Sequence, residues 1–254
     1  EPKLSRWMAL MALVLMLAFD TTAQTHTWSW SYGLTSNDPE VFRALAVDDT
    51  DASIYAVGDA ENTGIQIGPI NLLDQDQGFL AKFDAQGNML WYTPIGGSDQ
   101  ETAENIAVAP NGTVFITGAF EGNCYFYNAG SSFVANNLVS FSGSKDIYVA
   151  AFDPNGQFLW AKQLGNANDE LLPDIAADAT GIAVIGSYKG SLSVNSTASA
   201  TALNTTAYHT FLLRMDLGGT HQWMLTGGSS GEDVPATIVS DGSRIYVGQV
   251  GGAT

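Results

Sequence analysis

The chain is poor in positive charge. It has 9 lysines and arginines against 26 aspartates and glutamates, which gives a formal net charge of −17. A surface of this sign repels nucleic acids and anionic lipids, so we expect no nucleic-acid partner. The same surface could attract cations, but a solvated acidic surface is the simpler interpretation.

Cysteine is almost absent as well. Cys124 is the only one, so no internal disulfide can form and the fold must be stabilised by its core. A chain that is 45% hydrophobic and 11% aromatic can supply such a core. Because Cys124 begins an aromatic run, Cys124–Tyr127, we predict a buried, unreactive thiol.

The chain also lacks a long hydrophobic run. The longest, Trp7–Phe19, is shorter than the roughly 20 apolar residues that cross a membrane. It follows two basic residues and precedes the small residues Thr21–Ala23, which is the pattern of a secretory signal peptide. We therefore predict a signal peptide over residues 1–23 and a mature chain, 24–254, without a transmembrane segment. The predicted location is secreted or at the outer cell surface.

No stretch of ten residues after position 24 has the period of an amphipathic helix, but one pattern recurs three times. In Phe79–Trp91, Ile147–Trp160 and Phe211–Trp223, an aspartate stands seven residues before a tryptophan. A glycine and a glutamate follow, and a weaker copy starts at Trp28. The tryptophans are 63, 69 and 63 residues apart. A repeat of this kind fixes the architecture before any single residue is interpreted. The repeated positions are Asp84, Gly87, Trp91, Glu101, Asp153, Gly156, Trp160, Glu170, Asp216, Trp223 and Glu232.

Each repeat contains four short extended runs separated by turns. In the best copy these are residues 79–83, 90–95, 105–109 and 113–119. The fourth run is apolar on both faces, which indicates a sheet covered on both sides. The runs with this property are residues 54–57, 114–116, 182–185 and 245–247.

Radially stacked four-stranded sheets satisfy this pattern. The sequence therefore predicts an all-β fold, a β-propeller of four-stranded blades with a 63–69-residue repeat over residues 24–254. A β-helix has much shorter repeats, and a sandwich would not repeat its sequence at this spacing. About four repeat units are present, which predicts an incomplete ring that continues beyond Thr254.

The pattern F-x-x-K-[FY]-D-x-x-G-x-x-x-W, with G-G-S and a glutamate after it, resembles the SBBP repeat. The match is best over Phe79–Gly122, and later copies depart from it at Ala151, Asn166 and Arg214. The resemblance implies about seven blades in a secreted or surface protein of a Gram-negative bacterium. It also implies further repeats or a sorting domain after Thr254. It is specific for the fold and nearly silent on function.

Two motifs suggest chemistry. Residues 227–231 match G-x-S-x-G, but residues 232–235 do not continue as the helix that a nucleophile elbow needs, so we interpret them as a turn. The motif D-x-x-G-x-x-x-W resembles the tryptophan-docking motif of quinoprotein dehydrogenases, but its aspartate and glycine are one residue closer and the threonine is missing. We interpret the tryptophans as anchors between adjacent blades. No catalytic, cofactor-binding or metal-binding residue is predicted.

The acidic residues after the tryptophans have two interpretations. In a propeller they fall on one rim, where oxygen ligands could bind a cation. They are the pairs Asp99/Glu101, Asp169/Glu170 and Glu232/Asp233. No D-x-D-x-D-G loop is present, so a turn that pairs with backbone amides is favoured. We expect His209 and His221 to be exposed and isolated; His26 likewise has no ligand spacing.

The segments 122–144 and 191–208 vary between repeats and are predicted to be loops or an extra hairpin. Such segments on a rigid ring are where a binding face belongs. Tyr125, Phe126, Tyr127 and Tyr208 either stack on sugars or belong to the core.

These observations predict a secreted or surface propeller that acts as a non-enzymatic binding or scaffold module. Its partner would be an unknown protein or glycan, and it would need no cofactor. The alternative is an extracellular enzyme, a quinoprotein-like oxidoreductase or a carbohydrate-active propeller, whose key residues lie outside this segment. A third reading makes the propeller a spacer for another domain.

Overall fold

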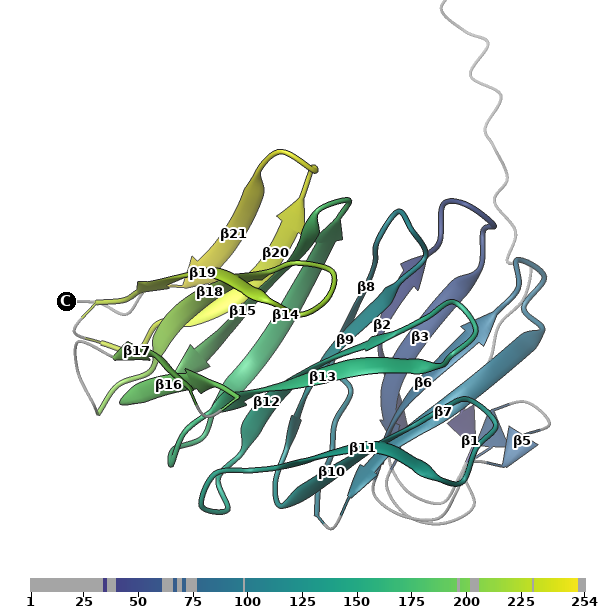
Figure 1. The fold of residues 1–254 in the computed structure, drawn as a ribbon, viewed down its shortest axis with the longest axis horizontal. Helices are drawn as coiled ribbons and strands as arrows, with labels where there is room; N and C mark the ends of the chain where they lie inside the picture. Colours follow the sequence, from purple (N-terminus) through teal and green to yellow (C-terminus); the bar gives the residue numbers. More distant parts are fainter. Residues whose placement is uncertain are drawn as a thin grey trace, which may run out of the picture. The chain divides into compact units, whose positions relative to one another are not determined.

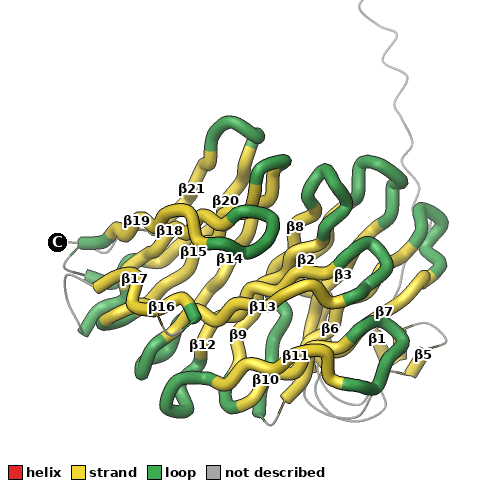
Figure 2. Tube along the Cα trace, in the orientation of Figure 1, coloured by secondary structure: helices red, strands yellow, loops and turns green. Residues whose placement is uncertain are grey.

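The computed structural model describes residues 34–35, 40–60, 66–67, 70–71, 77–97, 99–195, 197–201, 206–229 and 231–250. All of them belong to one compact unit, Tyr32–Thr254. They form antiparallel strands and turns and contain no helix (Figure 2), which confirms the all-β prediction. The predicted signal peptide, 1–23, and the tryptophan of the weakest repeat, Trp28, lie outside the described residues.

The strands build successive sheets (Figure 1). The first sheet has the order β11-β10-β7-β6-β3-β2, and the second the order β17-β16-β13-β12-β9-β8. Strands of the first sheet are β2 (Glu40–Val47), β3 (Ile54–Ala60), β6 (Gln77–Phe83), β7 (Met89–Gly97), β10 (Asn123–Tyr127) and β11 (Val134–Val139). Strands of the second sheet are β8 (Asn105–Val108), β9 (Val114–Phe120), β12 (Asp146–Phe152), β13 (Phe158–Gly165), β16 (Ser191–Val194) and β17 (Thr197–Thr201).

The third sheet has four strands in the order β14-β15-β18-β19, followed by a two-stranded terminal hairpin of β20 and β21. These are β14 (Leu171–Asp178), β15 (Gly181–Tyr188), β18 (His209–Met215), β19 (His221–Gly227), β20 (Val234–Ser240) and β21 (Ile245–Val250). A small sheet, β1-β4-β5, contains β1 (Leu34–Thr35), β4 (Gln66–Ile67) and β5 (Ile70–Asn71).

An added hairpin recurs at the same place in the repeat. The β10–β11 hairpin comes between β9 and β12 in the chain, but it pairs with β7 of the preceding sheet. The β16–β17 hairpin pairs with β13 in the same way, and β4–β5 pairs with β1. The expectation of four-stranded sheets is therefore wrong for the first two, which have six strands. The sequence predicted either loops or an extra hairpin for the variable segments 122–144 and 191–208. The structure shows an extra hairpin in each.

The sequence repeat and the sheet have different starting points. Runs 79–83 and 90–95 correspond to β6 and β7, the third and fourth of the four repeat strands in the first sheet. Runs 105–109 and 113–119 correspond to β8 and β9, which begin the second sheet. A repeat fixes its period but not where one structural unit ends, so the predicted unit spans two sheets.

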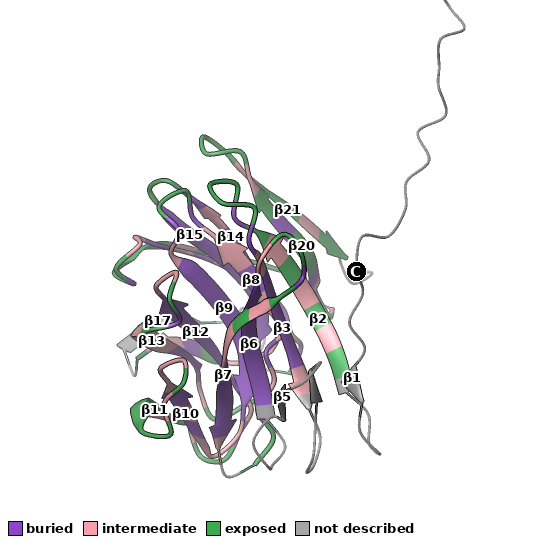
Figure 3. Cartoon of the chain, turned by 90° about the vertical axis from the view of Figure 1, so that its right-hand side faces the viewer, coloured by how far each residue is buried: buried purple, intermediate pink, exposed green. Residues whose placement is uncertain are grey.

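Successive sheets pack face to face around two main core clusters. The first cluster joins the first and second sheets, and the other joins the second and third. Strands β9, β12 and β15 are buried along their whole length (Figure 3), as expected for 114–116 and 182–185. The same expectation is wrong for 245–247, because Tyr246 and Val247 are exposed. No described strand covers the outer side of the terminal hairpin.

Candidate functional site

The three repeated aspartates start identical turns. The Oδ1 atom of Asp84 accepts hydrogen bonds from the backbone N–H groups of Gln86 and Asn88, at 2.9 and 2.8 Å. In the second copy, Asp153 Oδ1 accepts from the N–H groups two and four residues on. In the third, Asp216 accepts from the N–H of Thr220 at 2.8 Å. These aspartates therefore form the turns that separate two extended runs of each repeat.

Each turn carries a glycine in the left-handed conformation, three residues after the aspartate. The φ angles are +85° at Gly87, +76° at Gly156 and +78° at Gly219. A residue with a side chain adopts this conformation only at a cost, and here space is short as well. A Cβ added at Gly156 would lie 2.9 Å from the Trp91 ring, and one at Gly219 would lie 2.9 Å from the Trp160 ring.

The tryptophans connect neighbouring sheets. Trp91, on β7, donates its indole N–H to the carbonyl of Pro154, 3.2 Å away, in the turn of the second sheet. Trp160, on β13, donates to the carbonyl of Leu217, 3.1 Å away, in the turn of the third sheet. Each ring therefore covers the glycine of the next repeat, and we call this contact the tryptophan–turn lock. The interpretation of Trp91 and Trp160 as anchors between neighbouring sheets is confirmed.

Trp223 differs from the other two tryptophans. It stands at the same position of the third repeat, on β19, but 39% of it is exposed. The described part of the chain contains no further Asp-x-x-Gly turn after it. The expectation of a buried anchor is therefore wrong for Trp223 within the described residues.

Glu101 and Glu170, the repeated glutamates that follow Trp91 and Trp160, are buried. Glu170 has no exposed surface and accepts hydrogen bonds from the backbone N–H and the side-chain amide of Asn166. Glu101 is buried as well and lies against Gly97. Both carboxyl groups lie inside the fold, so the open acidic rim that could bind a cation does not form there. The backbone bond of Glu170 supports the turn interpretation instead.

The prediction for Glu232 was off by one residue. Glu232 is exposed and accepts a hydrogen bond from the backbone N–H of Tyr208, at 3.1 Å. The neighbouring Asp233 is buried, and its Oδ2 accepts from the backbone N–H of Ser229, four residues back, at 2.6 Å. Glu170 has the same spacing to Asn166. The structural equivalent of Glu170 is therefore Asp233, the second member of the predicted acidic pair Glu232/Asp233.

Two carboxyl groups lie close together between the second and third sheets. Burial, followed by the neighbouring carboxylate of Asp146, raises the pKa of Glu170 to about 9. Burial likewise raises the pKa of Asp146 to about 6. Hydrogen bonds from Gln163, Phe141 and Ser144 favour its charged form and partly offset this rise. At neutral pH the pair therefore holds a proton on Glu170.

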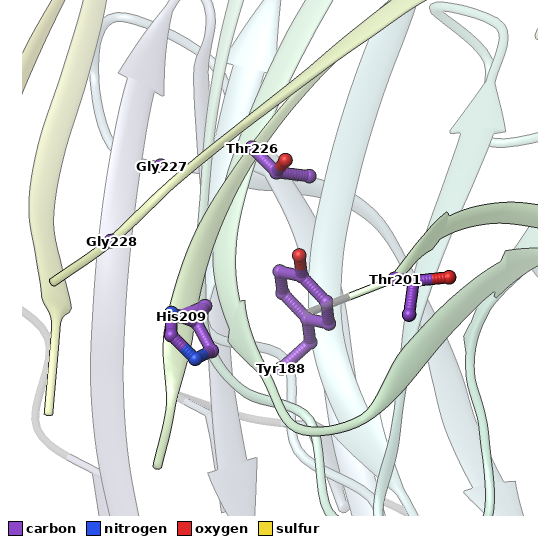
Figure 4. A pocket seen from close by; sticks show the side chains of 6 residues that line it. All are labelled: Tyr188, Thr201, His209, Thr226, Gly227 and Gly228. Carbon is purple, nitrogen blue, oxygen red and sulfur yellow. The ribbon is translucent and has the colours of Figure 1, made fainter. Parts of the chain in front are cut away.

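His209 was predicted to be exposed, and this is wrong. It begins β18, is only 2% exposed, and its Nδ1 lies 3.9 Å from Asp233 Oδ2. It faces a cavity of about 210 Å³ with Tyr188 and Thr226 (Figure 4). The other lining residues are Thr201, Gly227 and Gly228. His221 is exposed, as expected, at the start of β19.

No helix follows the G-x-S-x-G segment, in agreement with the prediction that it is not a nucleophile elbow. Its first residue, Gly227, ends β19, and the next regular element is the strand β20. Ser229 Oγ lies 3.4 Å from both carboxylate oxygens of Asp233 and accepts a hydrogen bond from the N–H of Gly231, at 3.2 Å. These local bonds explain the serine without any catalytic role.

The side chains of the added hairpins are divided between core and surface. Cys124 and Phe126 are fully buried, and burial raises the pKa of the Cys124 thiol well above its usual value. The prediction that Cys124 is buried is thereby confirmed, and Phe126 belongs to the core. Tyr125, Tyr127 and Tyr208 are half-buried. Phe133, next to β11, is 82% exposed.

Two wider searches complete the description. Among the described residues, no three histidine, cysteine or acidic side chains lie close enough together to hold a metal ion. Within the same residues, no helix has the length and apolar character needed to cross a membrane.

No family model matches the chain. It is similar to an uncharacterized WD repeat-containing protein of Acanthamoeba polyphaga mimivirus, with 23% identity over 192 residues, covering 66% of this chain and 14% of that protein. It is also similar to the regulatory protein FlaEY of Caulobacter vibrioides, with 25% identity over 270 aligned positions, covering 95% of this chain and 27% of that protein. The chain therefore spans a minor part of both curated relatives.

Proposed function

We propose that this chain is part of a β-propeller and acts as a non-enzymatic binding or scaffold module of a secreted or cell-surface protein. The observation that carries the proposal is the tryptophan–turn lock, which occurs twice and joins each sheet to the next. Glu101, Glu170 and Asp233 are buried in structural contacts, which supports a structural role for these acidic residues. The similarity to a WD repeat-containing protein supports a repeat-based binding module. The SBBP-like motif and the signal-peptide pattern support a bacterial surface location.

The binding face is proposed to lie on the added hairpins. The segments 122–144 and 191–208 contain no charged residue, in a chain with a net charge of −17. On the first hairpin, Phe133, Val134 and Val139 are exposed, and among the described strands β11 pairs with β10 alone. An uncharged surface with an exposed aromatic ring suits a protein or a glycan rather than an ionic ligand.

Binding can be tested with the full-length protein on an array of defined glycans and purified extracellular proteins. We expect the substitution Phe133→Ala to reduce the array signal. Deletion of the hairpin tip, which includes Phe133, should reduce the signal at least as strongly. Leu159→Ala is the matched control, because Leu159 is also exposed but lies on β13. Equal array signals from Phe133→Ala and Leu159→Ala would exclude this hairpin as the binding face. Protease treatment of intact cells, followed by detection of the protein, tests the surface location.

A second candidate is an extracellular enzyme with its reactive residues outside this segment. The His209 cavity favours it, because the repeat loses its symmetry there: Thr226 and Gly227 stand where the second sheet has Gln163 and Leu164. Assays with a quinone cofactor and with chromogenic glycosides distinguish the candidates. Turnover by the full-length protein that a single substitution abolishes would refute the non-enzymatic proposal.

A further inference from the structure

Strand β19 has the same place in the third sheet that β7 and β13 have in the first two. It follows an Asp-x-x-Gly turn, pairs with the strand before that turn, and carries Trp223 where the others carry Trp91 and Trp160. Two features distinguish it among the described residues. No hairpin is added to its outer edge, and Trp223 and Leu225 are 39% and 60% exposed.

The first two sheets show what covers this edge. On β7, Gly96 and Gly97 pair with residues of the β10–β11 hairpin. On β13, Leu164 and Gly165 pair with residues of β16. The register of β18 and β19 places Gly227 and Gly228 at the corresponding positions, beside the cavity of Figure 4. In both earlier sheets, the segment that adds this hairpin also supplies the turn that accepts the tryptophan N–H.

We propose that the outer edge of β19 is the docking site for the second half of the sheet that β20 and β21 begin. This segment would add a hairpin at Gly227 and Gly228, and its Asp-x-x-Gly turn would accept a hydrogen bond from the indole N–H of Trp223. The proposal rests on the proposed function, since it assumes that the stack of sheets continues. The occupant is the next repeat of a longer chain.

A second copy of this chain is a poor occupant. Its turns at Asp153 and Asp216 already hold Trp91 and Trp160, respectively, and Gly87 of the turn at Asp84 is already buried. The three repeated Asp-x-x-Gly turns of the described residues are therefore closed to the tryptophan of a neighbouring molecule. Two copies with a net charge of −17 each would also repel one another.

The docking site can be tested by extending the full chain with its own repeat. A copy of residues 189–228 is joined directly after Val250, because Gly186 and Gly248 stand at the same place, two residues before the ends of β15 and β21. The control extension carries Gly219→Val in the copied segment, since a Cβ at Gly219 of the parent chain would lie 2.9 Å from the Trp160 ring. Acrylamide quenching of Trp223 is obtained as the difference between each protein and its Trp223→Phe variant.

We expect the extension to reduce quenching of Trp223 to the level of Trp160, and the control extension to leave Trp223 accessible. Unchanged quenching in an extended chain whose circular dichroism shows the added strands would overturn the proposal. Light scattering that shows a dimer of the unextended chain with Trp223 already protected would overturn it in favour of a second copy.

A second measurement needs no extension. In the unextended chain, Trp160→Ala should lower the urea midpoint strongly, and Trp223→Ala should change it little. An equal loss from both would show that Trp223 already has a partner and would overturn the proposal. If Trp160→Ala has no effect, the tryptophan–turn lock fails, and the proposed function loses its main support. If Trp160 behaves as expected but Trp223 stays accessible in the extended chain, only the docking proposal fails.

Discussion

At the scale of single residues, the repeat uses carboxyl groups in two different environments. Asp84 and Asp216 are in exposed turns, where hydrogen bonds from neighbouring backbone N–H groups lower the pKa of Asp216, and the side-chain and backbone N–H groups of Asn88 lower that of Asp84. Glu170 accepts the same kind of backbone bond, but its burial raises its pKa. Residue type and local bonding are therefore not enough to predict charge; the depth of the group decides it.

Gly156 tests the tryptophan–turn lock at one position. We expect Gly156→Ala to destabilise the protein by about 1–3 kcal/mol for the left-handed backbone. The contacts of the new Cβ with Ala129 and Trp91 should add roughly 1–3 kcal/mol. Gly130→Ala is the control, because Gly130 has a φ of +72° but nothing within 4 Å of an added Cβ. Urea unfolding of both variants gives the difference. Equal losses would mean that Trp91 does not limit the space at Gly156.

Glu170 gives a prediction for pH. Its folded pKa, about 9, lies above its ordinary value, so its stabilising contribution is complete below about pH 4 and is lost as the pH rises toward 9. Glu170→Gln keeps a neutral side chain at every pH. We expect this variant to match the parent near pH 4 and to exceed its unfolding free energy by on the order of 5 kcal/mol at pH 8.

The parent protein is the reference for this prediction. Denaturant unfolding at several pH values between 4 and 8 measures both proteins. A Glu170→Gln curve parallel to that of the parent would show that Glu170 is ionised in the folded state.

At the scale of elements, the added hairpins extend one sheet although their sequence belongs to the next repeat. The β10–β11 hairpin buries Cys124 and Phe126 between the first and second sheets, and Phe126 stacks on Phe158 with ring centroids 5.6 Å apart. The hairpin therefore contributes to the core as well as to the surface. Its composition predicted an extra hairpin, but only the pairing with β7 shows which sheet it joins.

The two phenylalanines of this hairpin segment separate its core role from its surface role. Phe126→Ala should cost about 3–5 kcal/mol, because it empties a fully buried aromatic site. Phe133→Ala, at an 82% exposed position, should change stability by less than about 0.5 kcal/mol. Thermal and urea unfolding measure both. A small loss from Phe126→Ala would indicate that the hairpin is detached in solution.

At the scale of the whole described unit, burial depends on how many sheet neighbours a strand has. Strands β9, β12 and β15 are buried on both faces, whereas β19 and β21 have mostly exposed residues. Local stability should follow this gradient, because opening an exposed strand breaks few buried contacts.

Hydrogen–deuterium exchange tests the gradient in the unmodified chain. We expect the slowest exchange in β9, β12 and β15 and the fastest strand exchange in β19 and β21. Mass spectrometry of peptic fragments resolves these strands. Equally slow exchange in β19 would show that its open edge is covered in solution.

The sequence by itself determined the period of the repeat, the all-β class, the turns at Asp84, Asp153 and Asp216, and the role of Trp91 and Trp160. These depend on residues close in the chain or on spacings that recur, which are visible in one dimension. Only the tertiary structure decided where each sheet begins, which sheet receives each hairpin, that His209 is buried, and that Asp233 rather than Glu232 pairs with its turn. Burial and strand partnership depend on residues far apart in the chain, and a single sequence does not specify those neighbours.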